Sequence, residues 1–315
     1  MLKNIETPPY LPFVQQPDLV NIGVARLAKP RWIEPDADFS RYHNNKLQQA
    51  SIDQQRVYAA EPESIDAQAE FSQRLFTHLT VDHQQHFNHD AQSLYLPEQQ
   101  LSWPIHAPGD ASDSDTGDNA PLEQLWRSSL WIQDDICLLQ AYGGAGNSDY
   151  RLTAASVCAP SHWCLQEKIG QDFFAIHQPV PSFKKKLERP IRKLLAKLGT
   201  QPLVRANWGI SDTDTLMRLP EHQQIECNAD TELYLRIERQ SLSKLPATGA
   251  IVFTIRVYTH PLQSIAAIDG AVTALQKSIY AMNTQEYYYK SMHRLEKPLA
   301  RFFTRQRANA DNGSQ

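Results

Sequence analysis

The chain has 315 residues with an ordinary share of apolar and aromatic side chains, so it can bury a full hydrophobic core without cross-links. Its 31 lysines and arginines against 35 aspartates and glutamates give a formal net charge of −4, which excludes overall electrostatic attraction to nucleic acid or an acidic membrane. The four cysteines lack zinc-like pairing, and we expect reduced thiols. No stretch has membrane-spanning length and no signal-peptide pattern is visible, so we expect a soluble, cytoplasmic protein.

The N-terminal third predicts an arm followed by a helical segment. Prolines and isolated aromatics over 1–47 indicate an extended chain, in which Trp32 is an anchor. Apolar residues at helical spacing predict a helix over 67–79. We expect residues 1–106 to pack on a core that the later chain forms.

A histidine-rich segment and an acidic segment follow, and each could be either a metal site or an ordinary surface segment. His83, His86 and His89 recur at every third residue, which could place imidazoles around a metal, but a solvated polar turn is favoured. The acidic segment 107–120 resembles an EF-hand in composition and lacks its closing glutamate. We interpret it as a flexible surface loop and a boundary.

The middle of the chain predicts alternating strands and helices. A short helix over 122–130 precedes strands over 134–140 and 150–157, which a glycine-rich turn joins as a hairpin. Ser161 and Gly170 are typical of the first and last positions of a helix over 160–170. A basic helix ending near Leu198 is either a solvated amphipathic helix or a docking face for an acidic partner.

The remaining patterns complete the fold prediction. Strands are indicated over 204–210, 232–238 and 250–258, the last with the clearest apolar run. Together with the hairpin they predict an α+β domain over 121–262, built on one curved, mainly antiparallel sheet. Residues 263–315 are expected to form C-terminal helices that end in a frayed tail.

The stretch from Tyr150 to Trp208 concentrates more chemical functionality than a structural segment needs. Within it, His177 follows apolar Ile176 and precedes the rigid Pro179–Pro181 segment. This setting can hold an imidazole in the fixed orientation that an axial metal ligand requires. A satisfied core or turn histidine is the alternative.

Six motifs in this order resemble the haem-dependent oxidative N-demethylase family. They begin at Val157-Cys-Ala-Pro-Ser-x-Trp163 and continue through Glu167-Lys-Ile-Gly170, Ile176-His-x-Pro-Val-Pro181, Arg205-x-Asn-Trp208, Glu238-Arg-Gln-x-Leu242 and Leu245-Pro-x-Thr248. The resemblance implies a PAS-like domain carrying haem b, at which oxygen is activated to oxidise an N-methyl group, releasing formaldehyde. It also implies electrons from a separate NADPH-dependent flavin and iron–sulfur reductase, since this sequence has neither a dinucleotide fingerprint nor a ferredoxin-like cysteine run.

The resemblance also implies roles for individual residues. We expect His177 to be the axial ligand of the haem iron, with His162 as the alternative, whereas Cys158 is expected to be an ordinary buried thiol. Other cofactor contacts are expected from Arg205, Trp208, Arg239 and Arg256, of which the arginines could pair with haem propionates or form structural salt bridges.

The catalytic expectations concern the substrate and protons. A small secondary or tertiary amine is the expected substrate, with its ammonium held by Glu167 or Glu238. Tyr150 or Lys168 could supply protons to bound oxygen. The alternative for all four residues is that each is an ordinary surface residue or a member of an ion pair. A haem-based gas sensor and a haem-free scaffold are the competing functions.

Overall fold

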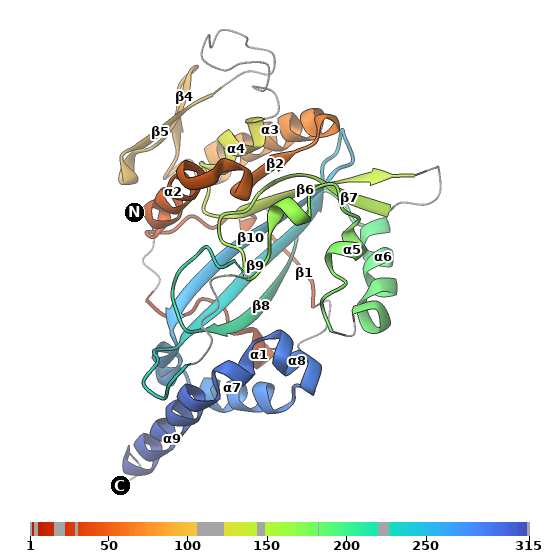
Figure 1. The fold of residues 1–315 in the computed structure, drawn as a ribbon. Coiled ribbons are helices and arrows are strands. Elements are labelled where there is room, and N and C mark those ends of the chain that lie inside the picture. The colour runs from red at the N-terminus through yellow and green to blue at the C-terminus, as the bar shows by residue number, and fades with distance from the viewer. Residues whose placement is uncertain are drawn as a thin grey trace.

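A seven-stranded antiparallel sheet organises the computed structural model of the chain (Figure 1). The structure describes residues 2, 6–15, 23–28, 31–105, 123–143, 149–181, 183–219 and 227–313. The strand order is β1 (Ala25–Arg26), β8 (Leu203–Ser211), β9 (Tyr234–Lys244), β10 (Ile251–Pro261), β6 (Asp135–Tyr142), β7 (Asp149–Ser156) and β2 (Tyr58–Ala60). The predicted α+β class, with an antiparallel sheet flanked by helices, is confirmed. Its PAS-like character stays a prediction.

The register of the strands divides their side chains between two faces of the sheet. Arg205 lies opposite Gln240, which lies opposite Ile255, so these three share one face, which we call the site face. Arg239 and Arg256 lie opposite each other one position along and therefore point to the other side, the core face. A shift of one residue thus separates the arginines that the sequence grouped together.

Helices from the N-terminal part cover one half of the core face. They are α2 (Phe39–Val57), α3 (Ile65–Asp82) and α4 (Gln124–Ser129), and beside them stands a small sheet of β3 (Asn88–His89), β4 (Ser93–Leu96) and β5 (Leu101–Pro104). Phe71 and Leu75 of α3 share a buried cluster with Leu138 and Val252 of the sheet. The predicted helix at 67–79 is confirmed within α3, because its apolar spacing matches one helical face.

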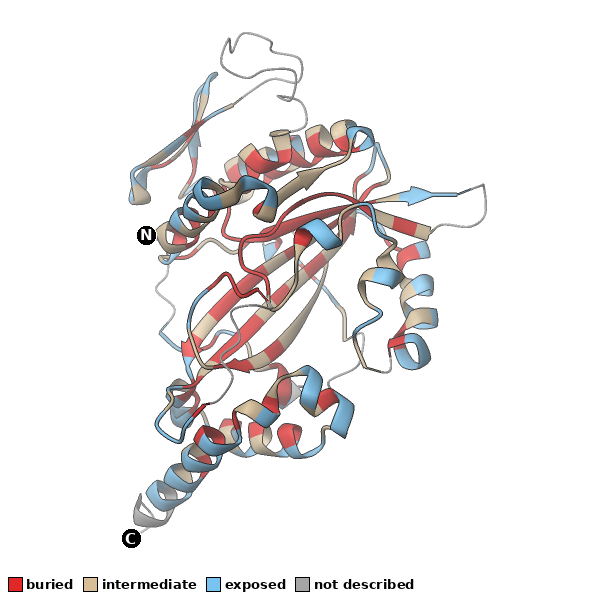
Figure 2. Cartoon of the chain, viewed as in Figure 1, coloured by how far each residue is buried: buried red, intermediate tan, exposed pale blue. Residues whose placement is uncertain are grey.

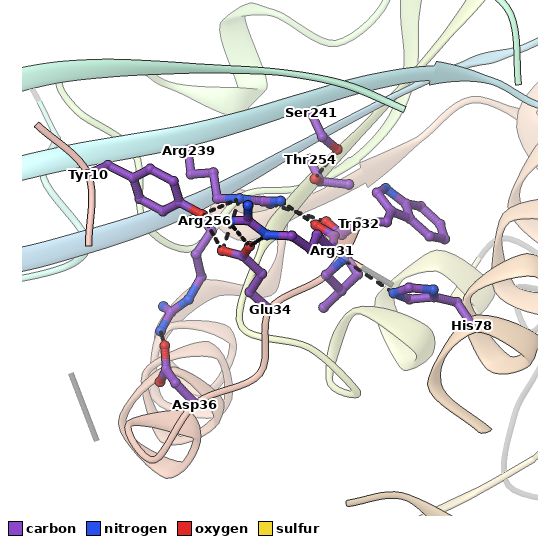
Figure 3. A network of polar contacts seen from close by, with 11 residues as sticks. Tyr10, Arg31, Trp32, Glu34, Asp36, His78, Arg239, Ser241, Thr254 and Arg256 are labelled. Carbon is purple, nitrogen blue, oxygen red and sulfur yellow. Dashed lines mark hydrogen bonds and ion pairs between the residues drawn. The ribbon is translucent and has the colours of Figure 1, made fainter. Parts of the chain in front are cut away.

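A buried polar network holds the N-terminal arm against the same face (Figure 3). The Arg239 guanidinium donates to the carbonyl oxygens of Arg31 and Trp32 and pairs with Glu34 at 3.1 Å. Arg256 donates to Asp36 at 2.7 Å. Trp32 is 2% exposed, which agrees with its predicted anchoring role.

A second cluster covers the other half of the core face. Trp208, Leu235 and Ile237 pack there against the C-terminal helices and α1 (Pro12–Gln15). These helices are α7 (Ala271–Tyr280), α8 (Thr284–Tyr289) and α9 (Glu296–Gly313). Helix α9 continues to Gly313 and buries Leu299 and Phe303 against this cluster. The expected frayed tail stays a prediction.

The site face is covered only in part. Over β6 and β7 lie η5 (Leu165–Glu167), α5 (Phe173–Ile176), the π-helical turn η6 (Phe183–Leu187) and α6 (Glu188–Ala196). Figure 2 shows buried residues along the middle of the sheet and half-buried ones along β8. None of the helices in the described part has the length and apolar character needed to cross a bilayer.

The helix predicted over 160–170 is wrong. Only η5 is helical there, because Ser161 bridges to Arg218 and His162 donates its backbone N–H to the Arg218 carbonyl at 2.7 Å. His162 also has a φ of 56°, which a right-handed helix excludes. The predicted loop at 107–120 lies outside the described residues, as does most of the hairpin turn. The proposed division at residues 106 and 262 stays a prediction.

Candidate functional site

His177 is held by a short helix that its own sequence caps. The Asp172 carboxylate accepts backbone hydrogen bonds from Phe174 at 2.7 Å and Ala175 at 3.2 Å, which fixes the first turn of α5. At the end of this turn, His177 Nδ1 lies 2.7 Å from the Phe173 carbonyl oxygen. A carbonyl only accepts, so Nδ1 carries the proton and Nε2 keeps its lone pair. In metal sites, a hydrogen bond of this kind from the ring nitrogen that does not bind the metal orients the imidazole.

Aromatic rings fix the plane of this imidazole. Phe183 stacks on it with centroids 5.2 Å apart and planes 17° apart, and Phe173 lies on it at 4.3 Å. Burial lowers the pKa of His177, and the charges of Arg205 and Lys168 lower it further, against the opposing hydrogen bond to Phe173. The imidazole is therefore neutral at pH 7, the form that can bind a metal.

Arg205 brings a half-buried cation to the same region. It projects from β8 on the site face, and burial lowers its pKa while the charge of Glu238 raises it. Its buried Nε has no hydrogen-bond partner among the described residues. A desolvated N–H without an acceptor is costly, so a further negatively charged group would be stabilised here.

Apolar side chains line the sheet between these polar groups. Leu203, Leu242, Phe253 and Ile255 share the site face and remain half-buried. Trp163 and Ile176 are also half-buried and pack at the edge of the same cluster. Apolar surface that the protein leaves partly uncovered suits a flat, hydrophobic ligand.

A polar group completes the far end of this face. The Glu238 carboxylate accepts hydrogen bonds from Gln240 at 3.1 Å and Asn207 at 3.4 Å, both on Oε2. The Lys290 ammonium, which follows α8, donates to Asn207 Oδ1 at 3.0 Å and to the Trp208 carbonyl. Burial lowers the pKa of Lys290 to about 8, with Glu238 opposing and Arg205 adding to the shift.

Comparison with known proteins shows the family of this chain. A family model described as haem-dependent oxidative N-demethylase, alpha subunit-like, matches residues 23–300. The chain belongs to this family. The matched range contains every strand of the large sheet and all the site-face residues described above. The suspected resemblance is therefore confirmed, and the family's description points to a haem cofactor and to an oxidoreductase.

The residues present fit a haem, as a member of a haem-dependent oxidative N-demethylase family requires. One neutral histidine with a free Nε2, one half-buried arginine whose Nε has no described hydrogen-bond partner and a half-buried apolar face would hold the iron, a propionate and the porphyrin ring. No cluster of three or more histidine, cysteine or acidic side chains suited to a metal occurs in the described part of the chain. A haem does not need one, because the porphyrin supplies the other nitrogen ligands.

The remaining predicted site residues are divided between the two faces. Lys168 lies near enough to His177 to lower its pKa. Glu167 is exposed on η5, and Tyr150 is buried among the apolar residues of β6 and β7. Trp208 lies on the core face, where its ring meets Phe13 at 5.4 Å.

Both buried arginines of the core face are occupied by the arm. The guanidinium groups of Arg239 and Arg256 bind Glu34 and Asp36, with side chains 0% and 1% exposed. These are the structural salt bridges that the sequence left open as the alternative to propionate contacts. A surface hollow of about 270 Å³ between α7 and α9 holds none of the predicted site residues.

The two alternative ligands also have defined places. The Nδ1 atom of His162 is buried and has no hydrogen-bond partner among the described residues. Burial lowers the pKa of His162 to about 4. Cys158 is buried as a thiol whose pKa is raised by desolvation. A thiolate ligand is disfavoured at this position, because burial and the charge of Asp135 raise the pKa of the thiol more than the charge of Lys46 lowers it.

Sequence reasoning missed Asn207, Gln240 and Lys290 as members of this site. Asn207 and Gln240 lay inside the quoted motifs, and strand alternation places them on the side of Arg205 and Glu238. Lys290 directly follows the three tyrosines that end α8. No local signal reveals that α8 returns to the sheet.

Proposed function

We propose that the chain is the haem-binding oxygenase subunit of an oxidative N-demethylase and acts on a small secondary or tertiary amine. The observation that carries this proposal is the His177 imidazole, whose Nδ1 proton is bound by the Phe173 carbonyl while the half-buried Arg205 lies near it with an Nε that no described residue hydrogen-bonds. Family membership supports the same conclusion independently.

In this proposal the chain holds the cofactor with three kinds of group. His177 Nε2 binds the iron, Arg205 pairs with a propionate, and Leu242, Phe253 and Ile255 contact the ring. The sequence has no C-x-x-C-H attachment motif, so the haem is bound without thioether links, as haem b is. Bound there, haem supplies the oxygen activation that oxidation of an N-methyl group requires.

Glu238 is the group that we assign to the substrate. A small alkylamine is protonated at pH 7, and the described partners of Glu238 both bind Oε2, which leaves Oε1 to accept from the ammonium. The apolar residues on the same face exclude water around the methyl groups. Glu167 is exposed, so it fits this role less well than Glu238.

Proton supply is assigned to the cations around the site. Lys168 lies close enough to His177 to act on its pKa, whereas Tyr150 is enclosed by apolar side chains. Lys290 is a second candidate, because its pKa of about 8 lets it donate and recover a proton near neutral pH.

The proposed reaction balances with one oxygen molecule, two electrons and two protons. One oxygen atom is inserted into a C–H bond of the methyl group, so that the hydrogen ends on the new hydroxyl group of a carbinolamine. Cleavage of the carbon–nitrogen bond of this carbinolamine gives formaldehyde and the demethylated amine. The other oxygen atom leaves as water. The electrons are assigned to a separate NADPH-dependent flavin and iron–sulfur reductase, because this sequence has no dinucleotide fingerprint of its own.

The ultraviolet-visible spectrum of the haem-reconstituted protein tests the cofactor assignment. We expect a Soret band that is lost or shifted in His177→Ala and retained in His162→Ala, the matched control. A band that responds only to His162→Ala would contradict the ligand assignment. No band in the parent protein would overturn the oxygenase proposal.

Turnover separates an oxygenase from a gas sensor. Dimethylamine and trimethylamine are the probes, with reduced ferredoxin as the electron source, and oxygen consumption and formaldehyde are measured together. We expect both to depend on the amine. A protein that binds oxygen or carbon monoxide but gives no amine-dependent formaldehyde is a sensor.

A further inference from the structure

The segment from Phe183 to Leu198 carries an unusual concentration of positive charge. It contains seven lysines and arginines and a single glutamate, in a chain whose formal net charge is −4. Glu188 is paired with Arg192, and Lys186 lies 3.9 Å from Glu286. The other five cations are exposed and have no ion pair in the described part of the chain. We call these five the basic surface: Lys184, Lys185, Arg189, Lys193 and Lys197.

The fold fixes the direction of this surface. Leu195 and Leu198 bury one side of α6 against the apolar cluster of β6 and β7, so the cations of the helix face outward. In Figure 1, α6 lies beside α5 at the edge of the sheet. The basic surface therefore lies on η6, on α6 and on Lys197 at the end of α6, and it is not a loose charged tail.

The basic surface starts at the aromatic ring that lies on His177. Phe183 stacks on the imidazole at 5.2 Å, and the next residue in the chain is the exposed Lys184. Phe174 lies 6.2 Å from Phe183 and carries the Arg192 guanidinium at 3.9 Å from its centroid. One layer of aromatic side chains thus separates the ligand histidine from the cations at the surface.

We propose that the basic surface docks an acidic electron-donor protein, which delivers electrons to the cofactor at His177. This inference rests on the proposed function. Unpaired cations repel one another and add nothing to stability, but they attract and orient a partner of opposite charge. A donor seated on α6 is brought to the side of the cofactor that His177 and Phe183 cover.

Two other polyanionic partners fit less well. A membrane-bound amphipathic helix turns its apolar side to the lipid, whereas the apolar side of α6 is buried in the protein. Nucleic acid extends far beyond one short helix and would meet the rest of a chain with more acidic than basic residues. A compact acidic protein matches the size and place of the surface.

Binding of a labelled plant-type ferredoxin, which is acidic and carries an iron–sulfur cluster, tests the docking directly. The variant is Lys184→Gln, Lys185→Gln, Arg189→Gln and Lys193→Gln together. Its control removes four cations from α7 and α9: Lys277→Gln, Lys297→Gln, Arg305→Gln and Arg307→Gln. By fluorescence anisotropy at low salt, we expect the Kd to rise at least about tenfold in the variant and less than about twofold in the control. Equal effects in both would overturn the proposal.

Electron transfer is the second readout. With haem bound, we expect the second-order rate constant for reduction by reduced ferredoxin to fall about tenfold or more in the variant. The Soret band and the rate of reduction by dithionite, which needs no docking, should not change. A variant reduced at the parental rate would overturn the assignment.

The two readouts keep the proposals separate. If the protein binds no haem but the variant still loses ferredoxin, the proposed function fails and the docking surface stands. If the variant loses affinity for a 20-base-pair DNA or for anionic vesicles while its ferredoxin affinity is unchanged, the docking inference is overturned in favour of that partner.

Discussion

Replacing Asp36 should expose how strongly the arm depends on its buried ion pair. Asp36 and Arg256 meet at 2.7 Å with side chains 5% and 1% exposed, so Asp36→Ala leaves a guanidinium buried without its anion. Loss of one partner of such a pair costs about 3–5 kcal/mol. The Gln133 amide, which donates to Asp36 at 2.8 Å, loses its acceptor too, at about 1 kcal/mol. Together these are a large share of the roughly 5–15 kcal/mol that stabilises a folded protein.

Urea denaturation followed by tryptophan fluorescence measures this loss. We expect a lower midpoint in Asp36→Ala with an unchanged m-value, because the surface exposed on unfolding stays the same. The double variant Asp36→Ala, Arg256→Met removes both charges and should recover at least about half of the loss. A single variant that loses less than about 1 kcal/mol, or a double variant as unstable as the single one, would refute the reasoning.

Three further predictions concern the site itself. Arg205→Leu should lower the affinity for haem about tenfold or more, by haem-transfer titration. The apoprotein should lose only the attraction between the charges of Arg205 and Glu238, since the Arg205 Nε has no described hydrogen bond to lose; an apoprotein destabilised as strongly as by loss of a buried ion pair would contradict this. Glu238→Gln should raise the KM for dimethylamine about tenfold or more while the Soret band is kept, and an unchanged KM would remove Glu238 from the substrate site. For Lys290, the pKa is about 8 in the folded chain against 10.5 when exposed, so the unfolded state binds more protons between these values. The stability of the parent relative to Lys290→Met should therefore rise from pH 8 to pH 10.5 in urea titrations, and a flat difference would contradict the assignment.

Periodicity was enough to predict the elements that bury one side of themselves. Helix α3 and strands β6, β7, β8 and β10 fall close to where apolar spacing placed them, because each pattern reflects contact with the core. Strand β9 was predicted over 232–238 but continues to Lys244. The segment around His162 failed because its hydrogen bonds go to Arg218, 56 positions away in the chain. A helix-capping pattern cannot show such a partner.

The candidate site shows a different limit of sequence reasoning. Arg205, Arg239 and Arg256 look alike in sequence, and only the register separates the one on the site face from the two that hold the arm. The family motif led to His177 as the expected ligand, but it does not show the Phe173 carbonyl that orients the imidazole. Lys290 enters the site through the path of the C-terminal helices, which no local pattern specifies.

The buried arm also sets an order of events during synthesis. Asp36 leaves the ribosome 220 residues before the arginine that binds it, and β9 and β10 are the last strands of the large sheet to be made. At a synthesis rate of about 5–20 residues per second, the strands that bind the arm are completed on the order of 10–40 s after the arm itself. Throughout that time Trp32 and its neighbours are exposed on an unfinished polypeptide. The nascent chain is then a natural client for a chaperone.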